Sequence, residues 1–177
     1  ALIDKVLDFA KIERGKSAYD FQQSDLVEVV ERAVDIYRHR IDEAGAKLEY
    51  RVEEGLPPLM IDPHAITLAL INLIDNAVKY ASGTDVIGVE ISRRDSEVSL
   101  DVYDRGVGIP APYLKRVFDR FYRYEHEGDQ SHSQRGSGIG LSLVRHIAEA
   151  HGGSVVVTST PGVETRFSVK IPLEGRG

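Results

Sequence analysis

Residues 62–80 read Asp-Pro-His-Ala-Ile-Thr-Leu-Ala-Leu-Ile-Asn-Leu-Ile-Asp-Asn-Ala-Val-Lys-Tyr, and this stretch decides how the rest of the chain can fold. Asp62 is a good helix cap and Pro63 a good first helical residue, so a helix is expected over residues 63–80. Apolar side chains cover most of the circumference of that helix. The helix must therefore be largely buried.

Four polar residues share one side of this otherwise apolar helix: Asn72, Asn76, Lys79 and Tyr80. Buried amide and ammonium groups need partners. One interpretation is that they cap neighbouring loops or bond to backbone. The other is that an Asn oxygen binds Mg²⁺, which prefers oxygen ligands and is usually shared with phosphates. Lys79 would then offset phosphate charge, and Tyr80 would flank the base or sugar.

A second feature follows an alternating strand at residues 98–103, where the chain reads Asp104-Arg-Gly106-Val-Gly108-Ile109. A carboxylate at a strand end can project from the sheet edge, and the two glycines let backbone approach a ligand closely. Asp104 could accept a hydrogen bond from an adenine amino group. A plain turn explains the same residues.

A third feature, Gly136-Ser137-Gly138-Ile139-Gly140-Leu141, runs directly into a helix expected over residues 138–151. Its amides and the helix N-terminus could hold phosphate oxygens. The sequence lacks the Gly-Lys-Ser/Thr ending of a P-loop, and a polar loop precedes the glycines. A dinucleotide-binding fold would instead require a strand there.

The other elements are placed by their hydrophobic spacing and turn residues. Strands are expected at 19–23, 47–52, 59–61, 86–93, 98–103, 155–157 and 165–171, with a helix from Asp25 to near Gly45 and a short helix at 113–118. This order predicts an α/β (α+β) two-layer sandwich. It has a mixed, largely antiparallel sheet of about five strands and a small N-terminal hairpin, with about three helices on one face.

Arginines interleaved with aromatic residues lie between the two glycine turns, at positions 116, 120, 123 and 135. Arginine suits bidentate phosphate contacts, but a solvated, ion-paired loop is the alternative. Residues 125–134 include no apolar side chain, so this segment is expected to be mobile.

Composition narrows the classes of function. The 177 residues carry a formal charge of −6, which argues against a nucleic acid partner, and there is no Cys for thiol chemistry. No apolar run approaches the roughly 20 residues of a membrane span. We expect a cytoplasmic setting, including the cytoplasmic part of a membrane-anchored parent.

The ordered motifs resemble the ATP-binding catalytic domain of bacterial sensor histidine kinases, in the superfamily that also holds gyrase, Hsp90 and MutL. Residues 72–80 resemble the N box, 104–109 the first glycine box, 118–121 the F box, 136–141 the second glycine box, and Gly162 with Thr165 the terminal strand motif. Residues 7–13 are similar to the end of the second helix of the dimerisation and phosphoacceptor domain. The alternative for this N-terminal segment is packing on the same domain.

The resemblance implies ATP and Mg²⁺ as cofactors, with adenine at Asp104, Mg²⁺ held by Asn76 and a lid closing over the triphosphate. The residues it assigns to nucleotide binding are Asn72, Asn76, Lys79, Tyr80, Asp104, Gly106, Gly108, Ile109, Phe121, Gly136, Ser137, Gly138, Gly140, Leu141 and Thr165. Those it assigns to catalysis are Asn72, Asn76, Lys79 and Arg123.

It also implies three segments: 1–15 as the end of the dimerisation hairpin, 16–174 as the catalytic domain with its lid, and 175–177 as a tail. The expected partners are the phosphoacceptor histidine domain of the same parent, a response regulator receiver domain and a second copy in a parent homodimer. The chain has no His-Glu-x-x-Arg segment, so it should not phosphorylate itself.

Two alternatives stay open at this point. ATPases of the superfamily place a glutamate where Asn72 stands, and an amide cannot activate water as a base. This opposes an ATP-hydrolysing conformational clamp. The intact Asn76, Asp104 and glycines oppose a non-catalytic regulatory module.

Overall fold

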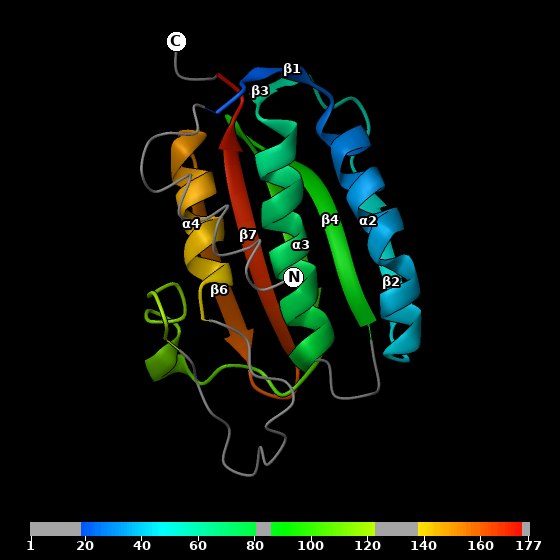
Figure 1. The fold of residues 1–177 in the computed structure, drawn as a ribbon, viewed down its shortest axis with the longest axis vertical. Helices are drawn as coiled ribbons and strands as arrows, with labels where there is room; N and C mark the ends of the chain where they lie inside the picture. The colour runs from blue at the N-terminus through cyan, green and yellow to red at the C-terminus, as the bar shows by residue number, and fades with distance from the viewer. Residues whose placement is uncertain (1–18, 81–85, 123–137, 175–177) are drawn as a thin grey trace.

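The structure is a computed structural model that describes residues 19–80, 86–122 and 138–174. Within these residues it forms two layers, with three helices on one face of a sheet (Figure 1). The elements are β1 (Gln22–Ser24), α2 (Leu26–Glu43), β2 (Lys47–Val52), β3 (Leu59–Ile61), α3 (Pro63–Tyr80), β4 (Val86–Arg94), β5 (Glu97–Asp104), the 3-10 helix η1 (Ala111–Tyr113), α4 (Gly140–Ala150), β6 (Ser154–Thr160) and β7 (Glu164–Pro172).

The main sheet has five strands in the order β2-β4-β5-β7-β6. The β2–β4 pair is parallel and the other three pairs are antiparallel. The predicted mixed, largely antiparallel sheet is therefore confirmed. The small second sheet pairs β1 with β3, but α2 and β2 separate these strands along the chain, so it is not a hairpin closed by a tight turn.

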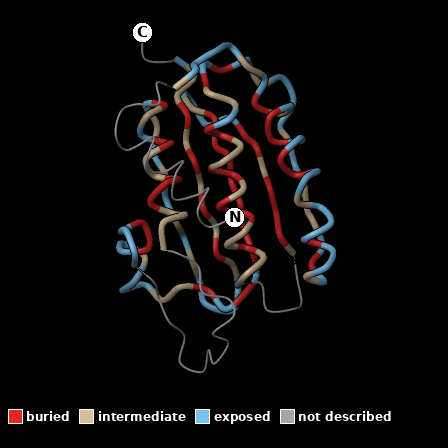
Figure 2. Tube along the Cα trace, viewed as in Figure 1, coloured by how far each residue is buried: buried red, intermediate tan, exposed pale blue. Residues whose placement is uncertain are grey.

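Helix α3 is the centre of the helical layer, and its predicted burial is confirmed. It contacts both α2 and α4 and lies over β4 and β5. Figure 2 shows that α2 is largely buried on its side towards α3 and exposed on its outer side. The core of the sheet face comes from alternate residues of the strands, among them Val98, Leu100 and Val102 of β5.

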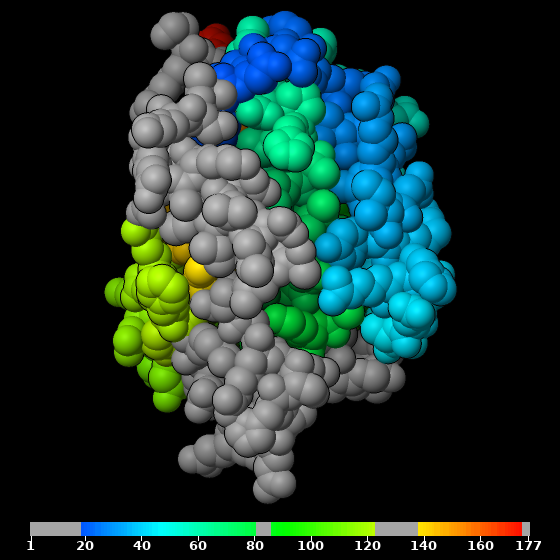
Figure 3. Space-filling model, viewed as in Figure 1, coloured from blue at the N-terminus to red at the C-terminus, as the bar shows by residue number. Residues whose placement is uncertain are grey.

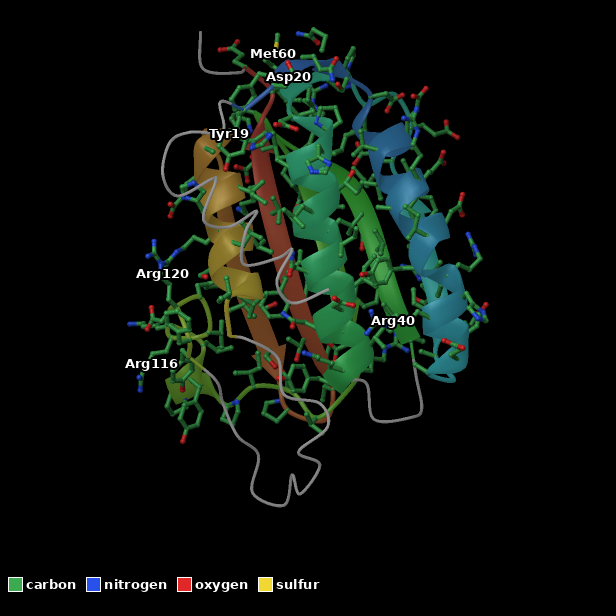
Figure 4. The ribbon with its side chains drawn as sticks, in the orientation of Figure 1. Tyr19, Asp20, Arg40, Met60, Arg116 and Arg120 are labelled. Atoms are coloured by element: carbon green, nitrogen blue, oxygen red, sulfur yellow. The ribbon has the colours of Figure 1, made fainter. Side chains whose placement is uncertain are left out.

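Helix α2 begins at a side-chain cap, because the Asp25 carboxylate accepts the Val27 N–H at 2.8 Å. Near its other end, Arg40 forms an ion pair with Asp75 of α3 at 2.7 Å (Figure 4). The surfaces of the two helices adjoin in the space-filling view (Figure 3). This pair links α2 to α3, in addition to the apolar contacts between the two helices.

The other face of the sheet carries a polar network centred on Arg166 of β7. Its guanidinium contacts Glu164, Glu90 and Asp101 and lies 4.2 Å from the centre of the Tyr103 ring. The Tyr103 ring covers Gly88 on the neighbouring strand, where a Cβ atom would overlap it. This face therefore differs in chemistry from the apolar face beneath the helices.

Several predicted elements differ from the structure, among them the strand expected at 155–157, which extends over Ser154–Thr160. Residues 111–113 form a 3-10 turn with a proline at its start, and turns rather than the predicted helix continue through residue 118. The first strand begins at Gln22 rather than Tyr19, and the side chains of Tyr19 and Phe21, which precede it, pack on His151. The last helix begins at Gly140 rather than at residue 138. Among the described helices, none is long and apolar enough to cross a membrane.

Candidate functional site

The apolar rows of the sheet end in a polar row on the helix side. Asp104 of β5 stands opposite Thr165 of β7, and Thr165 stands opposite Ser159 of β6. Asp104 lies two residues after the buried Val102, and Thr165 lies two residues before the buried Phe167, so they are on the same face of the sheet. The end of the sheet thus presents one carboxylate and two hydroxyls side by side.

Asp104 is a buried carboxylate with 5% of its surface exposed. Burial raises its pKa to about 6; the Gly106 N–H, which donates to Oδ1 at 2.9 Å, opposes that rise, and the charge of Glu164 adds to it. Among the described residues, this is the one hydrogen bond given to the carboxylate. The Gly106 N–H occupies Oδ1, so Oδ2 is the oxygen of this carboxylate to which no described residue donates.

The loop after Asp104 packs against the C-terminal end of α3. A Cβ atom on Gly106 would overlap the Tyr80 carbonyl oxygen, and the Val107 N–H donates to that same oxygen at 3.4 Å. Tyr80 itself is 42% exposed. The first glycine turn and the polar end of α3, which are separated in sequence, thus form one region of the molecule (Figure 1).

Asn72 joins α3 to the start of α4. Its Nδ2 donates to the Leu68 carbonyl at 2.7 Å, and a Cβ atom on Gly140 would lie 2.9 Å from its Oδ1. The side chain is 5% exposed, so it is held between the two helices. Asn76 and Lys79, further along the same helix, are only partly buried.

Phe121 marks the described edge of the second glycine turn. Its N–H donates to the Gly138 carbonyl at 3.0 Å, its φ is +61°, and its side chain is 71% exposed. A positive φ is uncommon for an aromatic residue. A Cβ atom on Gly138 would lie 2.9 Å from the Phe121 Cα, so these two backbones are in close contact.

The structure brings together most of the site residues expected from the sequence. Ile109 and Leu141 are partly buried against the core, and Thr165 is buried. Two turns of α3 separate Asn72 from Tyr80, a span of about 12 Å along the helix axis. Arg123, Gly136, Ser137 and the larger part of the expected lid lie outside the described residues, as do residues 1–15.

Two residues with defined contacts were missed from the sequence. Ser159 lies in the polar row and accepts the Ile109 N–H at 2.9 Å. His151 is buried at the opposite end of α4, where its Nε2 accepts the Asp62 N–H at 3.0 Å. Spacing in one strand or helix could not find them, because each contact depends on a distant element; the register of Ser159 opposite Thr165 was the available signal.

The fold and these contacts can be compared with known proteins. Residues 61–175 match the family described as histidine kinase-, DNA gyrase B-, and HSP90-like ATPase. The sensor protein RprX of Bacteroides fragilis is 30% identical over 97% of this chain and 33% of its own length. The sensor-like histidine kinase SenX3 of Mycobacterium bovis is 28% identical over 97% of this chain and 41% of its own length.

Among solved structures, full-length ShkA in complex with AMPPNP shares the fold with a TM-score of 0.84 and 24% identity. The match covers 99% of this chain and 36% of that one. The chain therefore spans between about a third and two fifths of these three relatives.

The chain belongs to the family of histidine kinase-, DNA gyrase B- and HSP90-like ATPases. Within it, the chain is the ATP-binding catalytic domain of a sensor histidine kinase, as the relatives that match it along nearly its whole length show. The resemblance drawn from its motifs is thus confirmed, and an ATP-hydrolysing clamp is not favoured.

Proposed function

We propose that this chain binds ATP with Mg²⁺ and positions the γ-phosphoryl group for transfer to a histidine on a separate domain of the parent protein. The observation that carries the proposal is the Asp104 carboxylate, which is buried at the sheet end, accepts one hydrogen bond from the described residues, and lies beside a glycine turn packed on α3. A buried acceptor of this kind costs stability unless a ligand satisfies it.

The adenine end lies at Asp104, Gly106, Gly108 and Thr165. The second oxygen of the Asp104 carboxylate accepts the adenine amino group, while Gly106 and Gly108 leave room for the ring because they lack side chains. The partly exposed Tyr80 ring and Ile109 flank the base or sugar. Recognition of adenine then rests on a carboxylate that a guanine carbonyl would not match.

The phosphate end lies between α3 and the start of α4. Asn76 supplies an oxygen ligand for Mg²⁺, and Lys79 offsets phosphate charge. The amides of Gly138, Gly140 and Leu141 at the α4 N-terminus hold phosphate oxygens, helped by the helix dipole. Gly136, Ser137, Phe121 and Arg123 complete this end, on the sequence evidence for the glycine and F boxes.

In the reaction, a nitrogen of the acceptor histidine forms a bond to the γ-phosphorus, and the bond from that phosphorus to the bridging oxygen of ADP breaks. Bound Mg²⁺ offsets the negative charge on the phosphate oxygens. The chain itself contributes placement and charge, since this class of transfer needs little covalent chemistry from the protein. Asn72 cannot take a proton from water, so transfer is favoured over hydrolysis.

The proposed segments and partners of the chain rest on the family resemblance. Residues 1–15 end the dimerisation hairpin, 16–174 form the catalytic domain with a lid at about 119–137, and 175–177 are a tail. The partners are the phosphoacceptor domain, a receiver domain and a second parent subunit, in the cytoplasm. The AMPPNP complex of ShkA, which has this fold, supports a nucleotide at the site.

The proposal is tested by mixing the chain with labelled Mg-ATP and the histidine-bearing hairpin of the parent. The label should appear on the hairpin as phosphohistidine and should not appear on the chain itself. Calorimetry with Mg-ATP supplies the binding constant for the same preparation. Steady phosphate release without a labelled hairpin would favour hydrolysis instead, and absence of ATP binding would leave only a regulatory module.

A further inference from the structure

We infer that Ser159 is a positioning residue for the nucleotide site, because its hydroxyl holds the glycine turn at residues 106–109 in place against the sheet. This inference rests on the proposed function, in which that turn contacts adenine. Ser159 belongs to the edge strand β6 and lies outside the motifs that the sequence analysis assigned.

The first contact fixes the end of the turn. The Ile109 N–H donates to Ser159 Oγ at 2.9 Å, across 50 positions of sequence. Ile109 lies beyond the last β5 residue, so the strand ladder does not satisfy its amide. The hydroxyl of Ser159 therefore takes the place of a backbone partner for the turn.

The second contact ties the same oxygen to the row that contains Asp104. Ser159 Oγ and Thr165 Oγ1 are 2.8 Å apart, and Thr165 is the residue directly opposite Asp104 in the sheet. Since Ser159 accepts from Ile109, its own hydrogen can be donated to Thr165. The two hydroxyls and the end of the turn are then joined by hydrogen bonds, and the start of the same turn is bonded to the Asp104 carboxylate through the Gly106 N–H.

The turn between β6 and β7 contacts the glycine turn from the same side. The Gly162 N–H donates to the Val107 carbonyl at 3.3 Å. Gly108 has a φ of +79°, and a Cβ atom there would be crowded by Pro161. The glycine turn is thus enclosed between Tyr80 on α3 and this hairpin, and Ser159 is the side chain that joins the hairpin to it.

The test compares Ser159→Ala with Ser159→Thr, which keeps the hydroxyl and suits an edge strand. Ser154→Ala is the matched control, because Ser154 is exposed at the other end of β6. Loss of one hydrogen bond to an enclosed amide should weaken Mg-ATP binding by about tenfold in Ser159→Ala. Ser159→Thr and Ser154→Ala should stay close to the wild type.

Two further readouts separate positioning from general loss of structure. The KM for ATP in transfer to the supplied hairpin should rise by about the same factor while kcat changes little, because the turn holds the base and not the reacting phosphate. The Ile109 amide should exchange its hydrogen about tenfold faster in Ser159→Ala without nucleotide, while amides in the centre of β5 keep their protection.

Unchanged Ile109 exchange together with unchanged ATP affinity in Ser159→Ala would overturn the inference. So would an equal loss of protection throughout β5, because Ser159 would then act on the whole sheet. If the wild type bound no ATP, the proposed function would fail, and the Ile109 exchange would still decide whether Ser159 holds the turn.

Discussion

Replacing Asp104 with Asn removes a buried negative charge and keeps the oxygen that accepts the Gly106 N–H. In the absence of nucleotide this substitution should stabilise the chain at neutral pH. The reason is that burial raises the pKa of Asp104 to about 6 from its ordinary value of 3.8, so ionisation of this group opposes folding. The same substitution should weaken nucleotide binding. When the amide oxygen accepts the Gly106 N–H, the amide nitrogen faces the adenine amino group, and both of these groups are hydrogen-bond donors.

The size of the effect follows from the two pKa values. The folded chain binds the proton more tightly than the unfolded chain, so stability contributed by this site falls as pH rises from about 4 to about 6. Above that window the cost of keeping the charge buried is roughly 3 kcal/mol. A buried amide N–H₂ group without a hydrogen-bond partner costs about 1–2 kcal/mol, which offsets part of the free energy gained by removing the charge. The net gain for Asp104→Asn at pH 8 should be roughly 1–2 kcal/mol, shrinking towards zero or reversing below pH 4.

Urea unfolding of both chains at pH 8, 6 and 4 measures this difference directly. Asp101→Asn is the matched control on the same strand, because Asp101 is buried but accepts hydrogen bonds from Arg166 at 3.0 Å and from Ser99 at 2.6 Å. It should destabilise the chain, since it breaks a paired charge. Saturating Mg-ATP should raise the stability of the wild type by about 3 kcal/mol at a hundred times Kd and that of Asp104→Asn far less. An Asp104→Asn chain that is less stable than the wild type at every pH would refute the reasoning.

Three other outcomes are expected. Asn76→Ala should lose Mg²⁺-dependent transfer to the hairpin by at least about tenfold while ATP binding measured in EDTA changes less, because the lost oxygen is a metal ligand; equal binding and transfer in the two chains would count against that role. Gly106→Ala should reduce ATP affinity beyond detection in calorimetry, because the new Cβ would displace the turn from the Tyr80 carbonyl; unaltered affinity would mean that this turn does not contact the nucleotide. Burial lowers the pKa of His151, whose Nε2 accepts the Asp62 N–H, so the stability of the wild type should fall as pH drops below about 6.5. A His151→Gln chain should lose that part of the pH dependence. If the urea midpoints of the two chains were identical at each pH, His151 would not contribute.

The sequence was most informative where one element carries its own pattern. Helix α3 matches its predicted bounds because Asp62 and Pro63 define its start and its apolar circumference requires burial. The strands at 47–52 and 59–61 were also placed correctly from alternation and from the flanking prolines. The polar residues on α3 were recognised because amides on a buried helix are unusual.

Contacts between elements that are distant in the sequence could not be predicted from the sequence alone. The sequence assigns Asn72 to the nucleotide, whereas the structure shows its side chain bonded to the Leu68 carbonyl and lying against Gly140. Its contact with nucleotide stays a prediction. Ser159 resembles any polar residue of an exposed strand until β6 is paired with β7, and the 3-10 turn at residue 111 depends on local prolines rather than on the apolar spacing of 113–118.

His151 illustrates the same limit at the far end of α4. Tyr19 and Asp20 lie at that end of the molecule (Figure 4), and the rings of Tyr19 and Phe21 pack around the imidazole. The Asp20 N–H donates to the Asp62 carboxylate at 3.0 Å. The chain has six histidines without a ligand-like spacing, and the contacts of His151 with Tyr19, Phe21 and Asp62 could not be predicted from that spacing.

A crystal structure of the chain with AMPPNP and Mg²⁺ tests the central claim most directly. The account predicts the adenine amino nitrogen within hydrogen-bonding distance of Asp104, the metal bonded to the Asn76 oxygen, and the phosphates at the N-terminus of α4. Nucleotide bound elsewhere, or bound at this end without a hydrogen bond to Asp104, would contradict it.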